Sequence, residues 1–222
     1  MIEAKNLVKT YRSGGKTVKA VDDASFTVRS GEMVAIIGHS GSGKTTLLSL
    51  IGGLTRPDSG LVALDGTDIW TINDDRLSEL RSRKIGFVYQ FSSLVPTLTA
   101  LENVMLPTVF GTGSKGAEEY AKELLGSMGL HDQMRSYPSQ LSGGQQRRVA
   151  IARAFINNPE IILADEPTGD LDEETEAEIV ELFKRMNREK GIAFLIVTHS
   201  SELARNAARQ MKMHSGSLSP QR

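Results

Sequence analysis

Residues 38–45 read Gly-His-Ser-Gly-Ser-Gly-Lys-Thr, a loop of the form G-x-x-x-x-G-K-[ST]. An apolar run at residues 33–37 precedes this loop, and a helix-compatible run at residues 46–51 follows it. Glycines let the backbone turn its N–H groups inward, and the following helix adds the positive end of its dipole. The segment therefore predicts a strand, a phosphate-binding turn and a helix in this order.

Two residues of this loop carry further chemistry. Lys44 is placed to reach the β- and γ-phosphates of a nucleotide, and the hydroxyl of Thr45 is placed to ligate Mg²⁺. We expect the whole loop and the residue after it to contact the nucleotide: Gly38, His39, Ser40, Gly41, Ser42, Gly43, Lys44, Thr45 and Thr46.

Four short apolar runs are continuous rather than alternating, which is typical of strands buried on both faces of a parallel sheet. They lie at residues 33–37, 85–89, 161–164 and 193–197. Between them, apolar stripes at helical spacing occur at residues 117–128 and 179–186. The alternation predicts an α/β fold with a parallel-sheet core.

The N-terminal part has a different pattern. Residues 2–11, 24–28 and 61–64 are β-like, and the last run ends in the turn pair Asp65-Gly66. We expect a small antiparallel sheet here. Residues 111–116 are expected to form a flexible loop, and the polar residues 214–222 a frayed tail.

Composition limits the function classes. The 222 residues are enough for one large domain, and 26 Lys and Arg almost balance 27 Asp and Glu. This balance gives no support to nucleic acid as the main partner. The absence of cysteine excludes disulfides and thiolate chemistry.

No signal peptide is evident, and no apolar run approaches the roughly 20 residues of a membrane span. Another chain must supply any membrane spans.

The apolar run at residues 161–164 ends in Asp165 and Glu166. At the carboxyl end of a parallel strand, a carboxylate faces the ligand crevice. Asp165 is placed to hold Mg²⁺ through water, and Glu166 to orient or deprotonate an attacking water. A strand followed by a capped helix looks similar, but the position about 120 residues after a phosphate loop favours the catalytic assignment.

Residues 141–145 read Leu-Ser-Gly-Gly-Gln and lead directly into a helical pattern. A serine hydroxyl and free N–H groups at a helix start are suited to a phosphate. Local physics alone favours an ordinary N-cap followed by a surface helix.

All these motifs together resemble the nucleotide-binding subunits of ABC (ATP-binding cassette) transporters over residues 2–215, because residues 141–145 match the family signature LSGGQ. The resemblance implies that two protomers bind ATP and Mg²⁺ between them as an ATP-induced head-to-tail homodimer. The signature residues that would bind the γ-phosphate held by the other protomer are Ser142, Gly143, Gly144 and Gln145.

The resemblance also implies a domain organisation. A P-loop NTPase core with an N-terminal antiparallel β subdomain would comprise residues 1–85 and 160–215. An inserted α-helical signature subdomain would comprise residues 91–158, and residues 216–222 would be a polar tail.

Four further residues match family positions. Tyr11 resembles the aromatic residue that stacks on adenine, with packing in the small sheet as the alternative. Gln90 resembles the glutamine that senses Mg²⁺ and water, with a solvated strand end as the alternative. Asp172 resembles the residue that signals across the dimer, and a helix N-cap is compatible with that role. His199 resembles the switch histidine that contacts the γ-phosphate.

The implied catalytic residues are thus Lys44, Gln90, Glu166 and His199, and the implied metal ligands are Thr45, Gln90 and Asp165. Two positions depart from the family pattern. Ser200 follows His199 where close relatives usually carry Asp, and Asp170 stands where Asn is common. Neither departure removes a catalytic atom.

Residues 89–91, 98–104 and 209–213, together with Pro96, resemble the lipoprotein-release and macrolide-export group. This resemblance implies a separate membrane permease that docks near residues 90–107 and works by mechanotransmission. The chain would then lie in the cytoplasm, peripheral to the inner face of the cell membrane, and its permease would select the cargo.

The alternatives are ABC ATPases that act in DNA repair, on ribosomes or in cell division. Repair-type members carry long coiled coils between loop and signature, but here Thr45 and Leu141 are less than a hundred residues apart. Ribosome-associated members usually join two cassettes, and this chain has one. No nucleic-acid partner is expected.

Overall fold

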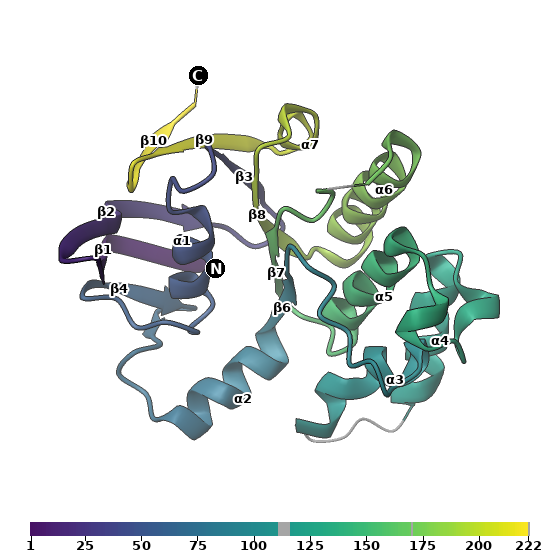
Figure 1. The fold of residues 1–222 in the computed structure, drawn as a ribbon. Helices are drawn as coiled ribbons and strands as arrows, with labels where there is room; N and C mark the ends of the chain where they lie inside the picture. Colours follow the sequence, from purple (N-terminus) through teal and green to yellow (C-terminus); the bar gives the residue numbers. More distant parts are fainter. Residues whose placement is uncertain (111–115, 170, 222) are drawn as a thin grey trace.

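The computed structural model describes residues 1–110, 116–169 and 171–221, and in this part of the chain the strands form two sheets (Figure 1). The larger sheet has six strands in the order β10-β9-β3-β8-β7-β6, and the smaller has four in the order β2-β1-β4-β5. In Figure 1 the parallel strands lie between the smaller sheet with α1 on one side and most of the helices on the other.

The parallel strands are those that the continuous apolar runs predict, so this expectation is confirmed. Neighbouring strands pair in parallel, and β7 and β8 are buried along their whole length. Burial on both faces explains why the runs do not alternate. The four strands are β3 (Met33–Ile37), β6 (Ile85–Val88), β7 (Ile161–Asp165) and β8 (Ala193–Thr198).

The C-terminal residues form a hairpin, so the expectation of a frayed tail is wrong for most of residues 214–222. Strand β9 (Arg209–His214) pairs in parallel with β3, and β10 (Ser217–Pro220) pairs antiparallel with β9. The turn residues Ser215 and Gly216 both have positive φ, as tight two-residue hairpin turns require. Backbone hydrogen bonds hold these strands together, and the hydropathy of the sequence does not reveal such bonds.

The N-terminal antiparallel sheet is confirmed, although one strand is longer than expected. Strand β1 (Ile2–Ser13) lies between β2 (Lys16–Val28) and β4 (Ser59–Leu64), and β5 (Thr67–Asp68) continues the sheet. The first four residues of β2 are exposed, and charged side chains interrupt the apolar ones in residues 16–23, which is why this stretch carried no strand signal. They pair with the end of β1 in a hairpin.

Two helices lie on the same side of the parallel strands as the small sheet. Helix α1 (Lys44–Ile51) buries Leu47 and Leu50 completely in a core that also holds residues of both sheets. Helix α2 (Asp74–Lys84) buries only Leu77, and its sequence has no apolar stripe. The hydropathy pattern therefore did not predict this helix. Its remaining signals are an Asn73 cap, an acidic first turn and a basic last turn.

The other helices pack together in a second core. Helices α3 and α4 both contact α5. Gly116 precedes α4 with φ 91°, whereas the rest of the loop expected at residues 111–116 lies outside the described residues. These helices are α3 (Ala100–Met105), α4 (Ala117–Ser127), α5 (Gly143–Phe155), α6 (Glu173–Lys190) and α7 (Ser201–Arg205), with short 3₁₀ helices at Leu106–Phe110, His131–Gln133 and Pro138–Gln140.

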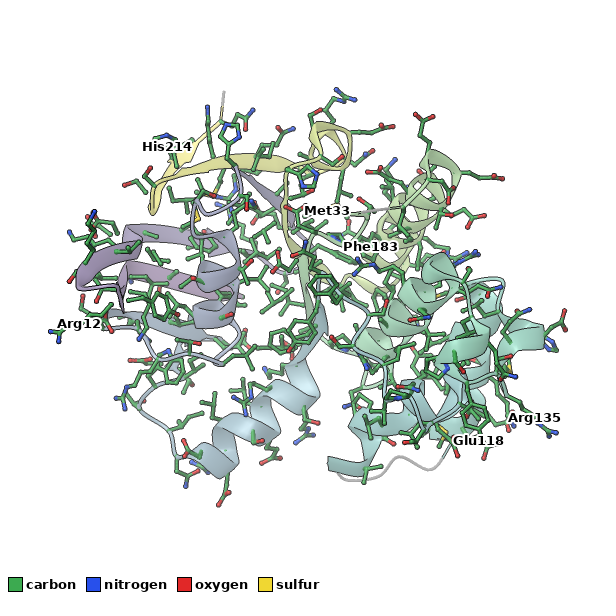
Figure 2. The ribbon with its side chains drawn as sticks, viewed as in Figure 1. Arg12, Met33, Glu118, Arg135, Phe183 and His214 are labelled. Atoms are coloured by element: carbon green, nitrogen blue, oxygen red, sulfur yellow. The ribbon has the colours of Figure 1, made fainter. Side chains whose placement is uncertain are left out.

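Three aromatic rings join these helices to the sheet. Phe194 of β8 lies 5.0 Å from Phe183 of α6 and 6.4 Å from Phe155 of α5, measured between ring centroids. Figure 2 shows Phe183 and Met33 in the interior between α6 and the sheet, whereas Arg12 projects outward. Across the described parts of the chain, no helix combines the length and hydropathy that a membrane crossing needs.

We expect Phe194→Ala to lower the free energy of unfolding by about 3–5 kcal/mol, because Phe194 is fully buried and its loss leaves a cavity. Urea unfolding followed by circular dichroism measures this change. The matched control is Val109→Ala, at a side chain that is 74% exposed, with a change within about 0.5 kcal/mol. Equal stability of the two variants would contradict this account of the core.

Candidate functional site

The glycine-rich loop connects β3 to α1 and is clamped by two other strands. At Gly43, with φ 106°, a Cβ atom would lie 1.9 Å from the carbonyl oxygen of Ala20 in β2. At Gly38, a Cβ would lie 2.4 Å from the carbonyl oxygen of Met213 in β9. Only glycine fits at these two positions: tertiary packing requires it at both, and the backbone conformation requires it also at Gly43.

Lys44 is buried at the centre of this loop, with 7% of its surface exposed. Its ammonium donates to the carbonyl oxygens of Gly38 at 2.7 Å and His39 at 3.2 Å. Its Nζ also lies 3.7 Å from Oε1 of Glu166. Burial of an ammonium requires such partners. The loop therefore holds a positive charge at the place where the sequence predicts phosphates.

A cleft of 610 Å³ opens over the loop, a size typical of small-molecule sites. The structure brings all four predicted catalytic residues together in its wall, although they come from distant parts of the chain. Gly38 is the one predicted loop residue that does not line the cleft. The lining residues are Val18, Ala20, His39, Ser40, Gly41, Ser42, Gly43, Lys44, Thr45, Thr46, Gln90, Asp165, Glu166 and His199.

Asp165 ends β7 and is buried, with 6% of its surface exposed. Burial raises the pKa of its carboxyl, and the Glu166 carboxylate raises it further. A hydrogen bond with Thr45 and the charge of Lys44 oppose this increase in the pKa. A bound cation would favour the ionised form of such a group.

Asp165 and Thr45 thus offer two neighbouring oxygen ligands, which suits Mg²⁺. Within the described residues, no three His, Cys, Asp or Glu side chains are grouped closely enough to hold a metal ion. Mg²⁺ usually binds through one or two protein oxygens together with waters and substrate phosphates. The buried hydroxyl of Ser42 has no hydrogen-bond partner among the described residues, so it is free to bond to a ligand in the loop. The donor set therefore fits Mg²⁺ bound with a nucleotide.

Glu166 adopts a left-handed backbone conformation, with φ 46°, which is uncommon for a residue other than glycine. Its backbone N–H donates to the carbonyl of Val197 at 2.9 Å. Its Oε2 accepts from the backbone N–H of His199 at 3.1 Å and lies 2.9 Å from Nδ1 of the His199 ring. Strained residues held in this way cluster at functional sites. Lys44 and His199 therefore approach different oxygens of one carboxylate.

Tyr11 does not line the cleft but lies beside its rim. It pairs with Val18 across β1 and β2, and Val18 is part of the cleft wall. Directly paired residues of antiparallel strands share one face of the sheet. Tyr11 is 44% exposed, with Nζ of Lys9 at 5.7 Å from its ring centroid, so part of the residue is accessible beside the cleft.

The signature residues are not in the cleft of their own chain. Ser142 caps α5: its hydroxyl accepts from the N–H of Gln145 at 3.2 Å, and Gln145 Oε1 accepts from the N–H of Ser142 at 2.9 Å. A Cβ at Gly143 would meet nothing within 4 Å, so this helix end is open. The N-cap alternative is therefore present in the structure, and it leaves the glycine N–H groups accessible.

Asp172 is the N-cap of α6 and also lies outside the cleft. It accepts from the N–H and the hydroxyl of Thr175 at 2.9 and 2.8 Å, and these bonds hold the pKa of its carboxyl below the usual value. The second family departure, Asp170, lies outside the described residues.

Sequence analysis missed two arginines that hold the Gln90 segment. Arg147 of α5 is buried and donates to the carbonyl oxygens of Tyr89 and Gln90. Arg153, two turns further along α5, donates to the carbonyls at positions 92 and 93, at 2.8 and 2.9 Å. Arginines beside the apolar residues of α5 were the available signal, because a buried guanidinium needs acceptors.

Comparisons with known proteins agree with this geometry. The lipoprotein-releasing system ATP-binding protein LolD of Bordetella avium (strain 197N) is 47% identical over 220 residues, covering 99% of this chain and 96% of that protein. The macrolide export ATP-binding/permease protein MacB of Syntrophobacter fumaroxidans (strain DSM 10017 / MPOB) is 45% identical over 224 residues. The match covers 100% of this chain but 31% of that relative.

Solved structures give the same result. Two dimeric structures of MJ0796, a bacterial ABC transporter cassette, superpose with TM-scores of 0.92 at 42% and 43% identity. Each match covers 100% of this chain and 99% of the solved chain, and one of the two is a post-hydrolysis state bound to ADP and Pi. The family model for ABC transporters matches residues 21–169. This chain therefore belongs to the ABC transporter family.

Proposed function

We propose that this chain is the ATP-hydrolysing subunit of an ABC exporter and that it powers a separate membrane permease of the lipoprotein-release or macrolide-export type. The observation that carries the proposal is the convergence of Lys44, Asp165, Glu166 and His199 in one cleft. The names of the relatives LolD and MacB support the exporter type. In this role the chain would lie in the cytoplasm, attached to the inner face of the membrane through its permease.

Residues of this chain would bind ATP both at its phosphates and at its adenine. Loop N–H groups and Lys44 would bind the phosphates, and Tyr11 at the cleft rim would stack on adenine. Thr45, Asp165 and Gln90 would hold Mg²⁺, directly or through water. The bound ion would supply positive charge that neutralises the phosphate oxygens.

Glu166 is the proposed general base. Its carboxylate is held between Lys44 and His199 at the carboxyl end of β7, where it can orient a water and accept its proton. His199 and Lys44 would then stabilise the charge of the γ-phosphate as the water attacks. The constrained backbone of Glu166 supports this role, because it fixes the base before substrate binds.

The open end of α5 supports a shared site. Ser142, Gly143 and Gly144 present a helix N-terminus, yet they do not line their own chain's cleft. A second copy arranged head to tail would bring this helix end to the γ-phosphate. The dimeric MJ0796 cassettes support such an arrangement. Asp172 would then contribute at the dimer interface.

The link to a permease is proposed to run through the Gln90 segment. Arg147 and Arg153 join the signature helix to the backbone of residues 89–93. Beside this segment lies a groove of 450 Å³ whose wall includes Tyr89 and Pro107, and the Phe91 side chain is 73% exposed. Exposed aromatic residues of this kind are typical of contact surfaces. Motion of α5 would thus reach a partner docked near residues 90–107.

Lys44→Ala should weaken ATP binding roughly 10- to 100-fold, because a charge-assisted bond to phosphate is lost. Titration with a fluorescent ATP analogue measures the dissociation constant. Lys122→Ala, which removes an exposed lysine from α4, is the matched control and should bind normally. Unchanged affinity in Lys44→Ala would contradict the phosphate-loop assignment.

Glu166→Gln should retain ATP binding but lower kcat by about 10²–10⁴-fold, because the amide cannot accept the water proton. With hydrolysis blocked, ATP should trap the closed dimer. Steady-state phosphate release and light scattering with and without ATP measure the two effects. Full turnover in this variant, or a monomer at saturating ATP, would overturn the proposed mechanism.

Phe91→Asp should abolish co-purification of a membrane permease from detergent-solubilised membranes, because a charge replaces an apolar contact. ATP binding by the isolated chain should stay normal, since Phe91 lies outside the cleft. The matched control is Leu54→Asp, at another exposed apolar side chain, which should leave the complex intact. Recovery of ribosomes, a repair complex or a division protein in place of a permease would instead support the alternative class.

A further inference from the structure

One carboxylate oxygen of Glu176 lies between the turn that follows Glu166 and the turn that follows His199. Oε1 of Glu176, in the first turn of α6, accepts from the hydroxyl of Thr168 at 3.0 Å. The same oxygen accepts from the hydroxyl of Ser200 at 3.1 Å. Thr168 is buried, and the other two side chains are half-buried. Hydrogen bonds to an ionised acceptor in such surroundings are stronger than neutral ones.

Each hydroxyl belongs to a turn that carries catalytic chemistry. Thr168 lies two residues after Glu166, in a turn closed by a bond from the N–H of Gly169 to the carbonyl of Glu166 at 3.1 Å. Ser200 directly follows His199, and its hydroxyl also caps α7 by accepting from the N–H of Leu203 at 3.2 Å. Glu176 therefore ties the turn behind the base to the turn behind the switch histidine.

The two hydrogen bonds to Glu176 depend on the residue types at positions 168 and 200. Each hydroxyl has a single proton, and both donate it to Glu176. Placing an aspartate at position 200 in place of Ser200 tests this dependence. A second carboxylate at that position would lie beside Oε1 of Glu176, and two like charges at this separation repel each other. A serine at position 200 is thus matched to the glutamate at position 176.

We propose that Glu176 is a positioning residue, which sets the separation of Glu166 from His199 by holding Thr168 and Ser200. It acts through these two residues and touches neither catalytic side chain in the described structure. The inference rests on the proposed ATPase function. Because Glu176 lies one turn after the Asp172 cap, it also joins α6, and with it the proposed dimer contact, to both catalytic turns.

The first test compares two substitutions at Glu176 by steady-state ATP hydrolysis. Glu176→Ala removes both acceptor contacts and should lower kcat by roughly tenfold, with KM for ATP within about twofold of the wild-type value. Glu176→Gln keeps an oxygen acceptor and should retain about half of the activity or more. Glu189→Gln, at an exposed glutamate near the other end of α6, is the matched control.

The second test introduces a carboxylate at position 200. Ser200→Asp should lower kcat about as much as Glu176→Ala, because the two carboxylates repel. The double variant Ser200→Asp/Glu176→Gln should recover most of the activity, since the amide N–H group can donate to the new carboxylate. A merely structural role for Glu176 would not give this reciprocal rescue. Thermal unfolding of every variant, read by circular dichroism, confirms that each is folded.

Normal kcat in Glu176→Ala or in Ser200→Asp would overturn the inference, and so would a double variant no more active than Ser200→Asp. In each of these cases active wild-type protein would leave the proposed ATPase function intact. A wild-type chain that hydrolyses no ATP would instead contradict the proposed function itself.

Discussion

The buried ammonium of Lys44 is the constraint on which the rest of the site depends. Its neighbours are loop carbonyls and one carboxylate, so the charge is satisfied by partners that a phosphate can join or replace. Gly38 and Gly43 allow this arrangement because neighbouring backbone leaves no room for a Cβ atom. The small antiparallel sheet and the C-terminal hairpin supply that neighbouring backbone. Both sheets therefore shape the phosphate loop.

Around this charge, the parallel strands bring distant residues to one edge. Glu166 follows β7 and His199 follows β8, so adjacent strands carry the proposed base and the histidine beside it. Contacts further out join the cleft to helices α5 and α6. Arg147 joins the signature helix to the Gln90 segment, and Glu176 joins α6 to both catalytic turns. These hydrogen bonds connect the cleft with the segment at which we propose that the permease docks.

The predictable part of the fold is the part in which side-chain burial decides the conformation. Strands β3, β6, β7 and β8 are continuous apolar runs because both of their faces are buried. Helix α2, the start of β2 and strand β10 were missed or misassigned for the opposite reason. They form through helix caps, a hairpin turn and backbone pairing, and most of their side chains face water.

The sequence by itself predicted the phosphate loop, the Asp165-Glu166 pair, the signature and the position of His199 after an apolar run, because each depends on residue types at short, fixed spacing. Tertiary structure decided which of these groups meet. It placed Gln90 and His199 in the cleft with Lys44, and left Ser142 outside it. It also created the contacts of Glu176, since neither the separation of 24 positions between Glu176 and Ser200 nor the residues in that stretch reveal that two hydroxyls share one oxygen. Chain folding sets such distances, and local sequence does not.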